Sequence, residues 1–150
     1  MHREIDFCRR EICEPPLHIS QVAQKIEDSY FSLSSDWEEI LKLEGRLEEL
    51  FAFDLPDLSK AVLLKTFMSC HTLALASTGL TEHALSIARL GERRIEILGK
   101  MERFWDQGEA MCLHAASLLH AHKRDEGARW YQQARDFGAL HGFFSVGKTP

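Results

Sequence analysis

The segment Met111-Cys-Leu-His-Ala-Ala-Ser-Leu118 has a counterpart earlier in the chain, Met68-Ser-Cys-His-Thr-Leu-Ala-Leu75. Methionine, histidine and leucine recur at the same positions of both segments, 43 residues apart. The same offset places Ala84 opposite Gly127. Self-similarity at a fixed period of this length is typical of helical repeats, in which each repeat is a hairpin of two helices. The sequence therefore predicts stacked helical hairpins.

The pattern around these segments is also helical. Leu, Ile, Ala and Met recur at spacings of three and four residues, and no stretch alternates for long between apolar and polar residues. Proline occurs only in the gaps between periodic segments, at Pro15, Pro16, Pro56 and Pro150. The predicted fold class is all-α, a short solenoid of antiparallel helical hairpins. Helices are expected over residues 2–13, 19–33, 35–51, 58–78, 82–101, 105–122 and 125–141.

These helices are expected to form a single domain. A short N-terminal helix precedes three hairpins, and a flexible tail follows them at residues 142–150. Gly79 is placed to end one helix, because glycine is the usual residue after a helix C-terminus. Ser35 and Glu38 match a capping box at the start of another helix. The three hairpins span residues 19–52, 58–101 and 105–141.

Composition excludes several classes of function. The 150 residues carry a net charge of -5, which disfavours a nucleic-acid-binding surface. Most of the negative charge falls in residues 1–56, where a run of glutamates is expected to form a solvated helix face. No stretch is long and apolar enough to predict a membrane span. Scattered cysteines without a secretory signal predict a reducing, cytoplasmic location.

The second of the two repeats, the hairpin at residues 105–141, resembles a tetratricopeptide repeat. That motif reads Trp-x2-Leu-Gly-x2-Tyr, then Ala-x3-Phe, then Pro. The matching residues here are Met111-x2-His114-Ala115-x2-Leu118 and Gly127-x3-Tyr131, with Ala134 three residues further on. The period of 43 residues exceeds the usual 34, as in members with longer helices. Neither repeat ends in proline, and histidine replaces the usual leucine.

The resemblance implies a concave groove lined by the first helix of each hairpin. Members that hold acidic carboxyl tails place Lys, Arg and Asn along it; these positions have none, so that function is disfavoured. An apolar groove with small residues suits a helical or extended peptide with apolar anchors instead. The chain's own N-terminal helix, with Ile5, Cys8 and Ile12, is an alternative occupant. The implied lining residues are Thr66, Ser69, Cys70, Leu73, Ala76, Ser77, Glu109, Cys112, Leu113, Ala116, Leu119 and His120.

The sequence gives less support for catalysis or for cofactor binding. Residues 142–149 match the P-loop pattern Gly-x4-Gly-Lys-Thr, but a helix is expected before them instead of a strand. His2, Cys8, Cys13 and His18 lack the spacing of a zinc site. No serine or cysteine has a base beside it in the sequence, and the recurring histidines are expected to pack in the hairpins. The chain is therefore expected to have no enzymatic activity, metal or cofactor.

The predicted function is protein–protein interaction, as an adaptor, a scaffold or a subunit of a larger assembly. The alternative is a regulatory helical domain that senses a small ligand or peptide. The C-terminal end is also expected to associate with a partner or a second copy, or to continue into a longer solenoid of which this chain is a piece, because stacked repeats need a capped end. Its apolar residues are Phe137, Leu140, Phe143 and Phe144.

Overall fold

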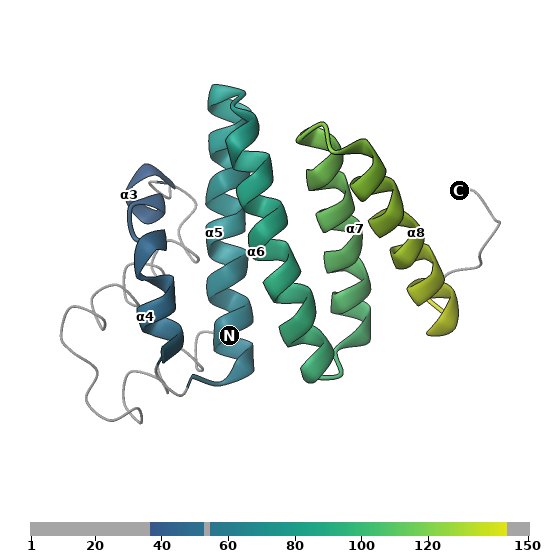
Figure 1. Cartoon of the computed structure of the whole chain (residues 1–150). Helices are drawn as coiled ribbons and strands as arrows, with labels where there is room; N and C mark the ends of the chain where they lie inside the picture. Colours follow the sequence, from purple (N-terminus) through teal and green to yellow (C-terminus); the bar gives the residue numbers. More distant parts are fainter. Residues whose placement is uncertain (1–36, 53–54, 144–150) are drawn as a thin grey trace.

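The computed structural model describes residues 37–52 and 55–143 (Figure 1). Every secondary-structure element in those residues is a helix, which confirms the all-α class. The short elements come first: α3 (Trp37–Leu41), the 3₁₀ helix η1 (Glu44–Arg46) and α4 (Leu47–Ala52). Four long helices follow: α5 (Asp57–Thr78), α6 (Thr81–Lys100), α7 (Phe104–His120) and α8 (Arg124–Leu140).

The long helices form a row in which each packs mainly against its neighbours in the sequence. α6 contacts α5 on one side and α7 on the other, α7 contacts α8, and α3 packs against α5. Figure 1 shows the chain reversing direction at each short connection, so that α5 to α8 run up and down in turn. The arrangement consists of two antiparallel hairpins, α5–α6 and α7–α8, with the short helices beside α5.

The bounds of α5 to α8 lie within two residues of those predicted, because local signals determine them. α5 begins directly after Pro56. A helix does not extend back through a proline, because the proline ring clashes with the preceding turn and the residue has no N–H to donate. It ends at Gly79, whose φ of 69° is the left-handed conformation that glycine adopts without strain. The Gly79 N–H donates to the Leu75 carbonyl at 2.8 Å. His122, with a φ of 63°, occupies the predicted polar turn between α7 and α8.

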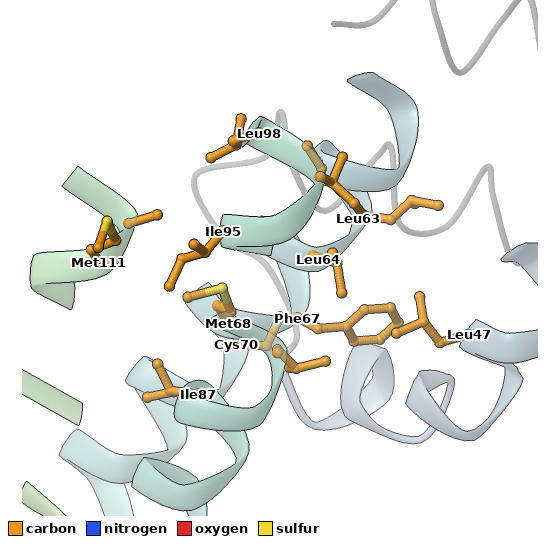
Figure 2. Packing of buried hydrophobic residues seen from close by; sticks show 14 of the residues in the cluster. Leu47, Leu63, Leu64, Phe67, Met68, Cys70, Ile87, Ile95, Leu98 and Met111 are labelled. Carbon is orange, nitrogen blue, oxygen red and sulfur yellow. The ribbon is translucent and has the colours of Figure 1, made fainter. Parts of the chain in front are cut away.

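α5 is the centre of the hydrophobic core. Figure 2 shows Phe67 pointing toward Leu47 of α4, whereas Met68 points toward Ile95 of α6 and Met111 of α7. Phe67 is completely buried. Neighbouring residues of α5 therefore pack on opposite sides, one against the short helices and one against the following hairpin.

The two hairpins meet at Gly91, in the middle of α6. A Cβ built on Gly91 would lie 3.4 Å from Met68 Cε of α5 and 3.5 Å from His114 Nδ1 of α7. Residues from both flanking helices thus meet over a position that has no side chain. At the corresponding place in the next repeat, α8 has Ala134, which is also buried. Gly91 and Ala134 are therefore buried small residues at equivalent positions of the two repeats, and small residues let helices approach closely.

The predicted helix over residues 35–51 is divided in the structure. The Leu43 N–H bonds to the carbonyl of Ile40, three residues back, and η1 follows at Glu44–Arg46. Gly45 lies within η1 and weakens a continuous α-helix, because glycine loses more conformational freedom than other residues on becoming helical. The break turns Glu44 toward α5, where it bonds to His71.

Several predictions lie outside the described residues. They are the N-terminal helix, the first helix of the first hairpin, the cap at Ser35, the four residues drawn as a zinc site, Phe144, and the P-loop-like segment from residue 144 onward. The helix expected before the P-loop-like pattern is α8, which ends at Leu140.

Candidate functional site

α5 and α7 each leave one stripe of side chains uncovered. On α5 the exposed residues recur at helical spacing from Lys65 through Ser69 and Leu73 to Ser77, and we call them the α5 stripe. On α7 they run from Glu109 through Cys112 and Ala116 to His120, and we call them the α7 stripe. Both helices bury the face that contacts α6, so each stripe lies on a face that α6 does not cover. Thr72 and Ala76 complete the α5 stripe; Leu113 and Leu119 complete the α7 stripe.

Most of the residues that the resemblance implied for the groove belong to these stripes. Leu73 is 45% exposed and Leu113 is 46% exposed, which are large fractions for leucine. Four other exposed residues of the stripes, Ser69, Thr72, Ala76 and Ala116, are small or hydroxylated. Of the implied lining, the exposed residues are Ser69, Leu73, Ala76, Ser77, Glu109, Cys112, Leu113, Ala116, Leu119 and His120.

Thr66 and Cys70 were predicted to line the groove, and the structure corrects this. Both are buried, at 3% and 2% exposure, so neither is accessible to a partner. Thr66 Oγ1 donates to the Val62 carbonyl at 3.0 Å, within its own helix. Cys70 belongs to the hydrophobic cluster that includes Ile40 of α3 and Leu47 of α4. The short helices cover this flank of α5, while no described element covers the corresponding flank of α7.

Beside the α7 stripe lies a hollow of about 210 Å³, lined by Trp105, Gly108, Glu109, Cys112 and Phe143. Partial burial of the sulfur atom raises the pKa of the Cys112 thiol, although the residue as a whole is exposed, and the neighbouring Glu109 carboxylate raises that pKa further. The thiol therefore stays protonated at neutral pH, which makes it a poor nucleophile. Phe143 packs edge-on against Trp105, with ring centroids 5.2 Å apart.

The apolar C-terminal residues divide into two groups. Phe137 packs against His141, with ring centroids 4.4 Å apart, and Phe143 packs against Trp105 as described. Phe137 also packs edge-on against Phe104 of α7, with ring centroids 6.3 Å apart, so these two phenylalanines cover part of α7 and are only partly available to a partner. Leu140 is 80% exposed.

A second hollow, of about 150 Å³, lies between α5, the C-terminal half of α6 and the start of α7. Its wall includes three cationic side chains, Lys65, Arg94 and Arg103, and one carboxylate, Asp106. Sequence reasoning missed this group because it considered only first-helix positions, and Arg94 and Arg103 lie on α6 and in the following turn. The available signal was Arg94 itself, a cation three residues after Gly91 on an otherwise apolar face.

A network of polar side chains joins η1 to the α5–α6 hairpin. Glu44 accepts from Arg89 at 2.6 Å and contacts His71 Nε2 at 2.6 Å, and His71 Nδ1 lies 2.9 Å from His83 Nδ1. Burial of the Glu44 carboxyl opposes its ionisation, but His71 and Arg89 together outweigh that effect and lower its pKa. The recurring histidines are both buried, yet His114 packs edge-on against Trp130 instead of joining such a network.

These pKa shifts predict that stability decreases in acid. Burial lowers the pKa of His114, although Glu92 and Glu126 act in the opposite direction. Below about pH 6.5 the unfolded chain binds a proton at His114 that the folded chain does not, so the free energy of unfolding falls. Glu44, whose pKa is also lowered, adds a further loss below about pH 4.5.

Urea unfolding between about pH 7 and pH 5 measures the first of these effects. We expect His114→Leu to flatten the dependence in that range, and His120→Leu, on the exposed side of the same helix, to leave it unchanged. An equal slope in the wild type and His114→Leu would contradict the assignment to His114.

No group of three or more His, Cys, Asp or Glu side chains within residues 37–52 and 55–143 is placed to bind a metal ion. In the same ranges, no helix has both the length and the apolar character needed to cross a membrane. Comparisons of the chain with protein-family models, with curated proteins and with solved structures find no match, so no family and no function are carried over from a relative.

Proposed function

We propose that this chain is a non-catalytic protein-interaction module similar to a tetratricopeptide repeat domain. Its α5 and α7 stripes form one binding surface for a helical or extended peptide with apolar anchors. The observation that carries the proposal is the pair of half-exposed leucines, Leu73 and Leu113, on the first helices of successive hairpins. Each is followed three residues later by a small residue, Ala76 or Ala116, which leaves room for a partner's side chains.

Two side chains with catalytic potential have environments that do not favour catalysis. The Cys112 thiol has a raised pKa, which disfavours the thiolate. His71 bonds to Glu44 and His83, and this network links η1 to the α5–α6 hairpin. These observations support binding over catalysis, and an adaptor, a scaffold or a subunit of an assembly is the role that such a module performs.

The alternative, a regulatory domain that senses a small ligand, has weaker support. The hollows of about 150 and 210 Å³ are smaller than the roughly 300–1,000 Å³ of typical small-molecule sites. A small ligand that raised the melting temperature in the absence of any peptide would favour this alternative. Self-association through Leu140 is a third possibility, which sedimentation at increasing protein concentration detects as a rising mass.

The test of the proposal uses peptides selected from a random library displayed on phage. Leu73→Glu with Ala116→Glu places two charges on the surface, and both positions are exposed, so the fold should persist. We expect the dissociation constant of a selected peptide to rise at least about tenfold, the equivalent of about 1.4 kcal/mol.

The matched control is Leu85→Glu with Ala128→Glu. It makes the same two chemical changes at exposed positions of α6 and α8, outside both stripes. Circular dichroism checks that both variants keep their helical content. Equal loss of binding in the two variants, or no loss in either, would overturn the assignment of the surface to α5 and α7.

A further inference from the structure

The hollow of about 210 Å³, which we call the aromatic hollow, lies at the start of the α7 stripe. Trp105, Glu109 and Cys112 follow one another at intervals of four and three residues, so they lie on one face of α7. All three line the hollow, and the last two also belong to the stripe. Figure 1 shows α7 and α8 running in opposite directions, so the start of α7 lies near the end of α8. A peptide bound along the α7 stripe therefore passes over this hollow.

Two aromatic rings from different parts of the hairpin line the hollow. Trp105 projects from α7 and is 61% exposed. Its ring centroid lies 5.2 Å from that of Phe143, and the two ring planes are nearly perpendicular, at 79°. The Phe143 N–H donates to the Gly138 carbonyl at 2.8 Å, and its ring stacks on His141 at 5.6 Å. Phe143 is therefore held in place beside α7 in the absence of a ligand.

Gly108 leaves space between these rings and α7. It is buried and lines the hollow. A Cβ built there would lie 3.5 Å from Phe137 Cδ1 and 3.7 Å from Phe143 Cδ2, so any longer side chain would compete with both rings for space. The resulting volume is smaller than the roughly 300–1,000 Å³ of a small-molecule site. It fits a single side chain of a partner better than a whole small molecule.

Glu109 is the one charged residue of the lining. The raised pKa of the Cys112 thiol keeps that group neutral at pH 7. Within residues 37–52 and 55–143, Glu109 forms neither an ion pair nor a hydrogen bond. Arg103, the closest cation in the sequence, pairs with Asp106 instead, at 2.8 Å. A carboxylate without a partner thus lies beside two aromatic rings, and both kinds of group attract cations.

We propose that the aromatic hollow binds the guanidinium group of an arginine in the partner peptide. The inference rests on the proposed function and deepens it by naming the chemistry of the partner. A guanidinium is planar and weakly hydrated, so it stacks on an aromatic ring while its N–H groups donate to a carboxylate. A lysine ammonium is a compact, strongly hydrated charge and gains less from such a site. Trp105 supplies the ring and Glu109 the carboxylate.

The position of the hollow on α7 also predicts a spacing in the peptide. Leu113, an apolar contact of the proposed surface, follows Glu109 by four residues, which is about 6 Å along the helix axis. A helical peptide presents residues at this separation four positions apart, and an extended peptide two positions apart, at about 7 Å. The arginine is therefore expected two or four residues from an apolar anchor.

The first test is the composition of the peptides selected by phage display. We expect enrichment of arginine at the stated spacing from Leu, Ile, Val or Phe. For a selected peptide, Glu109→Gln should weaken binding about threefold and Glu109→Lys about tenfold, because the first removes the charge and the second reverses it. Trp105→Leu should weaken it about fivefold. The matched controls are Glu96→Lys on α6 and Tyr131→Leu on α8, both exposed, and they should leave binding unchanged.

A double-mutant cycle tests whether Glu109 contacts the arginine itself. Citrulline has nearly the shape of arginine but no charge, so its substitution in the peptide should weaken binding to the wild type about threefold. Against Glu109→Gln, the same substitution should cost almost nothing, because the contact is already lost. Losses that add up in the cycle would overturn the pairing.

A second probe tests the hollow independently of any longer peptide. We would titrate acetyl-arginine-amide against ¹⁵N-labelled protein, with acetyl-citrulline-amide as the uncharged counterpart. The expected result is a shift of the Trp105 indole N–H and of the Glu109 and Cys112 amides with arginine, weakened by salt and nearly absent with citrulline. Larger shifts with acetyl-lysine-amide would overturn the assignment to a guanidinium.

The outcomes separate the two proposals. Selected peptides without arginine enrichment, bound equally by wild type and Glu109→Lys, would overturn the hollow and leave the binding surface in place. Arginine shifts at the hollow without any selected peptide would support the hollow and overturn the peptide-binding function. Shifts of the same signals on dilution of the free protein, or on Lys148→Met, would place a cation of this chain in the hollow and overturn its assignment to a partner.

Discussion

Replacing Phe67 with alanine is expected to destabilise the folded chain by about 3–5 kcal/mol, the usual cost of removing a fully buried phenylalanine. Phe67 has no exposed surface and points toward Leu47, so its loss opens a cavity between α5 and α4. Because α5 packs on its other side against α6, the helix cannot move to fill the cavity without breaking those contacts.

Urea unfolding followed by circular dichroism measures this effect as a lower midpoint. The matched control is Tyr131→Ala, which removes an aromatic side chain that is 53% exposed on α8 and should change stability by less than about 0.5 kcal/mol. Similar losses in the two variants would contradict the placement of Phe67 at the centre of the core.

Gly91→Leu is expected to separate the two hairpins. Cβ at this position would be in contact with both Met68 and His114, and the remaining atoms of leucine would overlap them. Overpacking of this kind costs about 1–3 kcal/mol or more. Gly91→Ala adds only Cβ, at ordinary contact distances, and replaces glycine inside a helix, so it should be neutral or stabilising by up to about 1 kcal/mol.

The opposite signs of these two substitutions make a sharp test, because both introduce a better helix former. Thermal unfolding of the two variants measures the sign of each change in stability. Hydrogen exchange of α7 and α8 shows whether the second hairpin has separated from the first. A stable Gly91→Leu variant with unchanged protection of α7 would show that the hairpins do not approach each other at Gly91.

The long helices were predictable because their signals are local. The helix ends are determined by local backbone conformation at Pro56, Gly79 and the polar turn around His122. The helical spacing of apolar residues indicates the helices between these ends. The repeat also predicted the buried positions of His71 and His114, since equivalent residues of a repeat have similar neighbours.

The errors arose where long-range contacts decide the outcome. Thr66 and Cys70 have the same helical positions as the exposed Glu109 and Leu113, and they are buried because α3 and α4 cover one flank of α5. Nothing in the α5 sequence indicates this cover. The break at Leu43 likewise brings Glu44 to His71, a pairing between residues far apart in the chain.

The group of charged side chains around the hollow between α5, α6 and α7 was missed for a similar reason. Lys65, Arg94 and Arg103 lie on two helices and a turn, and only the packing of α5 against α6 and of α6 against α7 brings them together. In the sequence, Lys65 and Arg103 resemble ordinary surface cations, and Arg94 alone differs by its place on an otherwise apolar face of α6. Sequence reasoning that assigns a binding surface to one helix of each hairpin cannot detect a site to which both helices contribute.

The central claim is that α5 and α7 present one peptide-binding surface, and amide chemical-shift mapping with a selected peptide tests it most directly. The account predicts that the largest shifts fall on both stripes, at residues such as Ser69, Leu73 and Ala116, and extend to Lys65. Shifts confined to the outer face of α6 around Leu85, or to the end of α8 around Leu140, would contradict it.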